Sequence, residues 1–284
     1  MTEGCTDELV FVKLGGSVIT DKTQPETDRS EVIARLAGEV ARASAARPEL
    51  RLVLGHGSGS FGHVVARHYG TRLGVRGAEQ WRGFAEVASV AALLNRIVAE
   101  QFLEAGIPVW SLQPSAMAWC RAGALVSMST RFVERALSVG LVPLLHGDVA
   151  LDEIRGGTII STEQIFAYLA RKLRPAQIVL VGVVDGVFDR DPLRDPSAKP
   201  VPEISAANWE KVQDTLGGSH ATDVTGGMQA KVAEMVSLVQ GTPGLTAHLI
   251  SGERHGALEA ILLDPTGTSG GTVIRWDGWT PGGR

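Results

Sequence analysis

The chain has 284 residues, of which 44% are hydrophobic and 20% are charged, and its formal net charge is -4. This size suits one large α/β domain or two lobes with a sizeable core. The weakly negative net charge does not favour general binding of polyanions, although a local basic cluster could still bind phosphate. Cys5 and Cys120 are not spaced as metal ligands, and no apolar run reaches the roughly 18 residues that a membrane-spanning helix needs. Because residues 1–8 lack the basic start and apolar core of a signal peptide, we expect a cytoplasmic protein.

Strand-like apolar runs alternate along the chain with amphipathic helical segments. The predicted strands are 9–14, 50–54, 107–112, 142–145, 178–184 and 246–250, and the predicted helices are 30–46, 85–105, 162–172 and 226–240. Residues 77–82 have the composition of a polar loop, and the Pro- and Asp-rich stretch 192–202 predicts a surface excursion at a possible lobe boundary. The alternation predicts an α/β fold with a largely parallel sheet between layers of helices.

Three glycine-rich segments, 13–17, 55–63 and 223–231, lie at predicted junctions between elements. Glycine lets backbone N–H groups approach an anion without a clash at Cβ, and ligands of parallel sheets bind beyond the carboxyl ends of the strands. One such segment is typical of a tight turn, whereas three, two of them with a lysine, predict phosphate binding. The common nucleoside-triphosphate loop is absent from the sequence. The Gly-x-Gly-x-x-Gly spelling at 57–62 lacks the acidic residue after a second strand that a dinucleotide site needs.

Taken in order, six segments resemble the amino acid kinase family, and specifically its isopentenyl phosphate kinases. The segments are 13–22, 56–63, 147–149, 185–188, 223–228 with Lys231, and 271–274. The Lys-x-Gly-Gly-Ser start is shared by many members of the family. The Gly-Ser-Phe-Gly-His sequence at 59–63 is much more specific, and it resembles isopentenyl phosphate kinases and the related fosfomycin kinases.

The resemblance implies one open αβα sandwich of the amino acid kinase type over residues 1–284. Its N-terminal lobe, about 1–170, would bind the phosphate acceptor, and its C-terminal lobe, about 171–284, would bind ATP. The implied reaction moves the γ-phosphate of ATP to isopentenyl phosphate, giving isopentenyl diphosphate and ADP, a step of isoprenoid synthesis in an alternative mevalonate route. The resemblance also implies a homodimer. Mg2+ is expected to arrive with ATP, with no protein ligand assigned to it.

Phosphoryl transfer needs positioning and charge neutralisation more than covalent help, and a phosphate acceptor is largely dianionic at neutral pH, so it needs no general base. By the resemblance, His63 hydrogen-bonds the acceptor phosphate and Lys22 stabilises the transferring group. Lys13 would lie between donor and acceptor, and Asp148 would orient the lysines. His56 is expected to be structural.

The remaining contacts are also carried over from the resemblance. The ATP contacts would be Lys13, Gly15, Gly16, Ser17, Ser58, Gly182, Asp185, Gly227 and Lys231. The acceptor contacts would be Gly57, Gly59, Gly62, His63 and Gly157. Helix 85–105 is expected to be mostly core, although its small side chains at Ala88, Ala91 and Ala92 could also admit a longer acceptor tail.

The chain departs from the family pattern at three places. Ser58 replaces a usual glycine, 161–164 is Ser-Thr-Glu-Gln where many members have Ser-Gly-Asp-Asp, and 182–185 is Gly-Val-Val-Asp in place of Thr-Asp-Val-Asp. The last two concern the ATP side and leave the ribose contacts unassigned. Three alternatives stay open: a fosfomycin-type kinase with a polar acceptor pocket, an amino-acid kinase that would not need His63, and a non-catalytic nucleotide-binding regulator.

Overall fold

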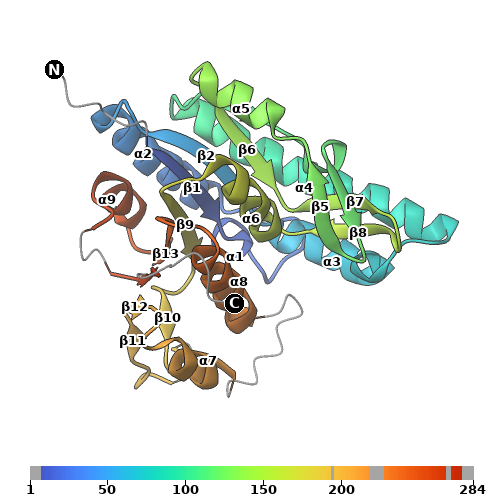
Figure 1. The fold of residues 1–284 in the computed structure, drawn as a ribbon. Coiled ribbons are helices and arrows are strands. Elements are labelled where there is room, and N and C mark those ends of the chain that lie inside the picture. The colour runs from blue at the N-terminus through green and yellow to red at the C-terminus, as the bar shows by residue number, and fades with distance from the viewer. Residues whose placement is uncertain (1–7, 193–194, 218–226, 267–269, 277–284) are drawn as a thin grey trace.

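The central sheet has eight strands in the order β12-β14-β13-β9-β1-β2-β6-β3 (Figure 1). The computed structural model describes residues 8–192, 195–217, 227–266 and 270–276. The strands are β1 (Leu9–Leu14), β2 (Arg51–His56), β3 (Val109–Ser111), β6 (Val142–His146), β9 (Gln177–Gly182), β12 (Glu203–Ile204), β13 (Thr246–Ser251) and β14 (Thr272–Ile274). Neighbours are parallel except β13 with β14, so the predicted, largely parallel sheet is confirmed.

Helices cover both faces of this sheet, which makes three layers. One face carries α5 (Arg131–Ser138), α6 (Thr162–Leu173) and α8 (Gly227–Gln240); the other carries α2 (Ser30–Ala46), α4 (Ala78–Glu104) and α9 (Ala257–Leu263). Successive side chains of β1 point to opposite faces of the sheet, so Phe11 packs toward α6 and Val12 packs toward α2. Full burial of each such side chain stabilises the fold by about 1.5–3 kcal/mol.

Helix α4 differs from its prediction because it begins at Ala78, so the predicted polar loop at 77–82 is wrong. The Oε1 of Gln80 accepts hydrogen bonds from the N–H groups of Arg76 and Gly77, which caps the helix start. Its first turns are polar and exposed, and they therefore lack the apolar spacing that marks a helix. Ala91 and Leu94 further along are buried in the core.

A second, four-stranded sheet was not predicted. Its order is β5 (Ala124–Met128), β4 (Ala118–Arg121), β7 (Asp148–Asp152) and β8 (Gly156–Ile160). The carboxylate of Asp152 accepts from the N–H groups of Ala122 and Gly123 in one turn and of Ile154 and Arg155 in the next. One side chain therefore ties two turns of this sheet together.

The short elements complete the chain. They are α1 (Gly16–Ile19), α3 (Gly59–Tyr69), α7 (Trp209–Gly217), β10 (Val187–Phe188) and β11 (Pro200–Val201). β10, before the predicted excursion at 192–202, pairs antiparallel with β11, which lies near the end of that stretch. β1 pairs with β9, so the sheet continues across the expected lobe boundary near residue 170. In the described part of the chain, no helix is both long and apolar enough to cross a membrane.

Candidate active site

The first two glycine-rich turns follow the carboxyl ends of the neighbouring strands β1 and β2 and pack against each other. A Cβ on Gly16 would lie 2.4 Å from the backbone N of Gly59, and a Cβ on Gly59 would lie 2.1 Å from Oγ1 of Thr20. Gly59 also has φ of +50°, in the left-handed region that favours glycine. The sequence suggested that these glycines make room for a ligand; at 16 and 59, the chain itself occupies the space at Cβ.

Thr20 joins the two turns and was not singled out in the sequence. Its Oγ1 donates to the O of Gly16 at 2.7 Å and accepts from the N–H of Ser60 at 3.0 Å. The N–H of Gly57 donates to the O of Leu14 at 3.0 Å. Both turns are therefore fixed to one another before any ligand binds.

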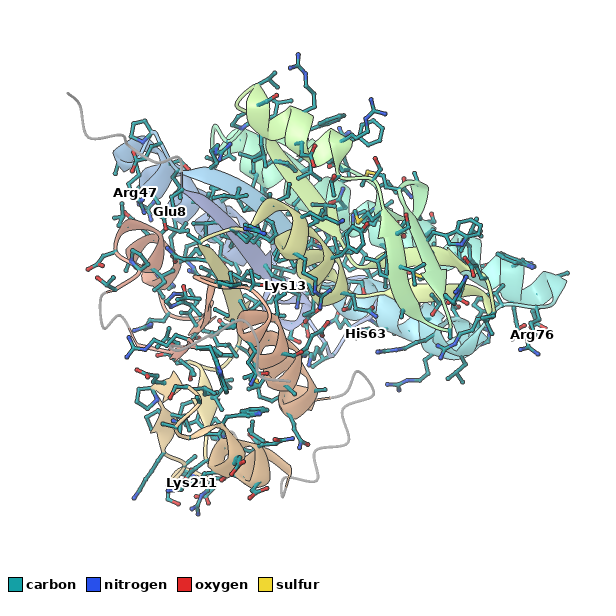
Figure 2. The ribbon with its side chains drawn as sticks, viewed as in Figure 1. Glu8, Lys13, Arg47, His63, Arg76 and Lys211 are labelled. Atoms are coloured by element: carbon teal, nitrogen blue, oxygen red, sulfur yellow. The ribbon has the colours of Figure 1, made fainter. Side chains whose placement is uncertain are left out.

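From Gly59 onward the predicted cradle is the first turn of α3, rather than a loop. The N–H groups of Phe61 and Gly62 bond to the O of Ser58 at 3.1 and 3.2 Å. Figure 2 shows Lys13 near the middle of the molecule and His63 on the side of α3 and the four-stranded sheet. His63 is exposed on α3, and Ser58 is half-buried at the helix start. The helix N-terminus carries partial positive charge, which favours an anion there.

Lys13 forms a buried ion pair with Glu163 of α6. The Nζ–Oε1 distance is 2.5 Å, and the two side chains are 11% and 9% exposed. Burial pushes the pKa of Glu163 up, but the charge and hydrogen bond of Lys13 outweigh it, so the pKa lies below its usual value. Ser161 caps α6 in a reciprocal pair with Gln164, at 3.1 and 2.9 Å. The Ser-Thr-Glu-Gln departure is thus a capping box that presents Glu163 to Lys13.

Asp148 has a different environment. It is buried at the start of β7, where its oxygens accept from the N–H groups of Ser115 at 3.0 Å and Val149 at 2.8 Å. Burial raises the pKa of Asp148 above its usual value, although these hydrogen bonds act to lower it. Among the described residues no ion pair joins Asp148 to a lysine, and Nε2 of His146 lies 3.8 Å from its Oδ2. The carboxylate partner of Lys13 in this structure is Glu163, and the role of Asp148 in orienting the lysines stays a prediction.

His56 and His146 stack in the core, with ring centroids 5.6 Å apart and an interplanar angle of 11°. Burial lowers the pKa of each to about 4. Nδ1 of His56 lies 3.1 Å from the O of Gly57, and Nε2 lies 3.1 Å from the amide of Asn95. Both partner atoms are oxygens, the backbone O of Gly57 and Oδ1 of Asn95, so the single N–H of the neutral ring donates to one of them at a time. These contacts agree with the structural role expected of His56.

Helix α8 brings two more charged residues toward Lys13 and Glu163. The charge of Lys231 contributes to lowering the pKa of Glu163. The pKa of Glu234 is raised, first by burial and then by the neighbouring charge of Glu163. Gly227 is the first residue of α8, and residues 223–226 of the predicted third glycine segment lie outside the described residues.

The ends of β9 and β13 lie beside the first glycine turn. The N–H of Gly15 donates to the O of Val181 at 2.8 Å, and the N–H of Gly252 donates to the O of Gly182 at 2.7 Å. Asp185 accepts from the N–H of Ser251 at 3.1 Å, and its Oδ1 lies 3.3 Å from the guanidinium of Arg254. Gly15, Gly16, Ser17, Gly182 and Asp185 therefore share one edge of the sheet.

Gly157 lies apart from these residues, in β8 of the second sheet. A Cβ there would lie 2.8 Å from the ring of Phe84 and 3.0 Å from Val75. Phe84 packs edge-on against Trp81, with centroids 5.3 Å apart. Gly157 thus borders an apolar group of α4 side chains.

A model of the amino acid kinase family matches residues 8–251. The isopentenyl phosphate kinase of Haloferax volcanii is 36% identical over 267 residues, covering 94% of this chain and 98% of that protein. The enzyme of the same name from Methanothermobacter thermautotrophicus is 34% identical over 263 residues, covering 90% and 95%.

A solved structure has a similar fold over nearly the whole chain. The crystal structure of a T. acidophilum isopentenyl phosphate kinase product complex has a TM-score of 0.76 at 27% identity, covering 94% of this chain and 100% of that chain. The family model thus covers most of the chain, and both relatives exceed 30% identity over at least 90% of it. The chain belongs to the amino acid kinase family.

Proposed function

We propose that the protein transfers the γ-phosphate of ATP to isopentenyl phosphate, giving isopentenyl diphosphate and ADP. The observation that carries this proposal is the second glycine turn, which leads into α3 and its exposed His63 next to the turn that follows Lys13. Relatives named isopentenyl phosphate kinases cover nearly the whole chain and support this acceptor.

In this mechanism the acceptor phosphate lies against Gly57, Gly59 and Gly62, and His63 hydrogen-bonds it in line with the γ-phosphorus. The N–H groups of Gly57 and Gly62 already donate to the O of Leu14 and the O of Ser58, so these two glycines contribute close approach of the backbone rather than hydrogen-bond donors. The acceptor is already anionic and attacks through its own oxygen, so no residue removes a proton. Lys22 stabilises the transferring phosphoryl group as negative charge moves toward ADP. Lys13 lies between the donor and acceptor phosphates and neutralises part of their charge. The pairing with Glu163 fixes the direction of the Lys13 ammonium.

ATP binds opposite the acceptor phosphate, at the edge of the sheet formed by the ends of β9 and β13. We assign it Gly15, Gly16, Ser17, Ser58, Gly182, Asp185, Gly227 and Lys231. Mg2+ would neutralise its phosphates. Oxygen ligands suit this ion, but Glu163 and Asp148 are already bound to Lys13 and to backbone N–H groups, so the phosphates would supply most of its ligands.

The division into an acceptor lobe, about 1–170, and an ATP lobe, about 171–284, is part of the same proposal. Gly157 would face the acceptor tail, since it borders Phe84 and Trp81. A homodimer and a cytoplasmic location stay predictions.

The test is ADP release from Mg-ATP with isopentenyl phosphate, fosfomycin, acetylglutamate and carbamate as acceptors. We expect turnover with isopentenyl phosphate that falls on the order of a hundredfold or more in His63→Ala. His68→Ala is the matched control, because His68 is also exposed on α3 and takes no part in the proposal. Turnover that prefers another acceptor, or that is indifferent to His63, would refute the assignment.

A further inference from the structure

Lys22 lies in a closed loop between α1 and α2. Thr20 and Asp28 pair as an antiparallel bridge, and inside it the N–H of Asp21 donates to the O of Thr27 at 2.8 Å. Lys22 itself is exposed. Its position therefore depends on what holds the two ends of the loop. Thr20 fixes the first end to Gly16 and α3.

Arg29 fixes the second end. Its N–H donates to the O of Ile19 at 2.8 Å, and its Nη1 donates to the O of Val18 at 3.0 Å. The same guanidinium binds both carboxylate oxygens of Glu253, at 2.5 and 3.1 Å. A two-pronged pair of this kind fixes direction as well as distance.

Glu253 follows directly after β13, at the edge where we place ATP. The N–H of Glu253 donates to Oγ of Ser251 at 3.1 Å, and the N–H of Ser251 donates to Asp185 at 3.1 Å. Arg29 and Glu253 are 224 residues apart along the chain, and their pair connects the Lys22 loop to Asp185 of the proposed nucleotide site.

The pair is a weak candidate for a purely structural role. The two side chains are 32% and 42% exposed, and pairs this exposed contribute little to folding stability. Their mutual hydrogen bond raises the pKa of Arg29 and lowers that of Glu253, so both are ionised at neutral pH.

We propose that Arg29 and Glu253 are positioning residues that hold the Lys22 loop at a fixed place relative to bound ATP. The inference rests on the proposed function, in which Lys22 contacts the transferring phosphoryl group. Without the pair, the loop would sample positions in which Lys22 misses that group, and kcat would fall while binding of isopentenyl phosphate would not.

The same interface offers a matched control. Arg42 of α2 and Glu259 of α9 form an ion pair of 2.8 Å that also joins α2 to the segment after β13. It lies away from the Lys22 loop. Glu259→Gln therefore removes a comparable contact without touching the loop.

The experiment measures kcat and KM for both substrates in Glu253→Gln, Arg29→Lys and Glu259→Gln. We expect kcat to fall about tenfold in the first two, with KM for isopentenyl phosphate within twofold and with the thermal midpoint nearly unchanged. Glu259→Gln should match the parent. In a Lys22→Ala background, Glu253→Gln should have no further effect on kcat, because the group that it positions is gone.

Two outcomes would overturn the inference. One is unchanged kcat in both Glu253→Gln and Arg29→Lys, and the other is an equal fall with and without Lys22. Hydrogen exchange of the Asp21 amide gives an independent readout: it should speed up in Glu253→Gln and not in Glu259→Gln. If the parent proved inactive on isopentenyl phosphate, the proposed function would fail, and the exchange rates would still support or refute the loop's anchor.

Discussion

The start of α6 and the start of β7 are held by the same carbonyl oxygen, at the end of β2. The O of His56 accepts from Oγ1 of Thr162 at 2.6 Å and from the N–H of Gly147 at 3.1 Å. One residue beyond each anchor comes a buried carboxylate, Glu163 in α6 and Asp148 in β7. One start begins a helix and the other a strand, and their two carboxylates have different partners.

Glu163 meets a charge, and Asp148 meets backbone N–H groups. The first arrangement sets the position and the electrostatic balance of Lys13, at the end of β1. The second arrangement connects β7 to the segment that begins at Ser115. Two carboxylates in similar places can thus serve different purposes, and the difference is in their partners rather than in their burial.

The largest effect is expected in the glycine turn that directly follows His56, where Gly59 packs against Thr20 and Gly16. Gly59→Ala should lower the free energy of unfolding by about 2–6 kcal/mol, from strain at positive φ and from the clash with Thr20. Gly70→Ala is the control, since Gly70 has φ of +62° with open space at its Cβ. Denaturant midpoints that fell equally in both variants would show that the turns are not packed as described.

The pH dependence tests the histidines between the two starts. The pKa values of His56 and His146 are lowered to about 4, so the unfolded chain takes up protons first. Stability should be full above about pH 6.5 and should fall as the pH drops toward 4, by about 3 kcal/mol for each ring. His146→Phe keeps the stacked shape, and we expect a shallower fall in the thermal midpoint; an unchanged slope would contradict the assigned burial.

Asp148→Asn tests the backbone side of the comparison. One amide hydrogen would replace an acceptor facing an N–H group, so we expect a loss of about 1–3 kcal/mol in the free energy of unfolding. Denaturant titration gives the value. A variant as stable as the parent would mean that these hydrogen bonds do not hold β7.

The smallest effect is expected at the capping box of α6. Ser161→Ala removes the acceptor for the Gln164 N–H and should cost about 1 kcal/mol. It should also loosen Glu163 slightly, so kcat should fall no more than about threefold. Thr130→Ala at the start of α5 serves as a control for the loss of a helix-start hydroxyl, because the Oγ1 of Thr130 bonds to Glu134 and neither residue has a role in the proposed site. A larger loss of kcat in the control would argue against the link between cap and catalysis.

The fold was predictable where one signal decided it. Apolar runs such as 9–14 and 246–250 gave the parallel sheet, because a strand buried on both faces is apolar throughout. The four-stranded sheet was not predicted, because its strands are short and many of their residues are exposed, so they form no continuous apolar run. Its turns depend on the side chain of Asp152, which a local pattern does not reveal.

The sequence placed Lys13 and the first two glycine turns at the ends of two strands, because each turn directly follows an apolar run. The pairing of Lys13 with Glu163 was not predictable, because the partners are 150 residues apart. The one signal was the departure at 161–164, where an acidic residue follows a capping serine. The ion pair between Arg29 and Glu253 could not be predicted either, since neither residue lies in a motif.

The most direct test compares the two carboxylates in one kinetic measurement. The kcat for isopentenyl phosphate at saturating Mg-ATP is measured in Glu163→Gln, Glu163→Asp and Asp148→Asn, below the unfolding midpoint of each. We predict a fall on the order of a hundredfold in Glu163→Gln, partial recovery in Glu163→Asp, and a fall of less than about tenfold in Asp148→Asn. A loss in Asp148→Asn as large as that in Glu163→Gln would contradict the assignment of Glu163 as the carboxylate that organises Lys13.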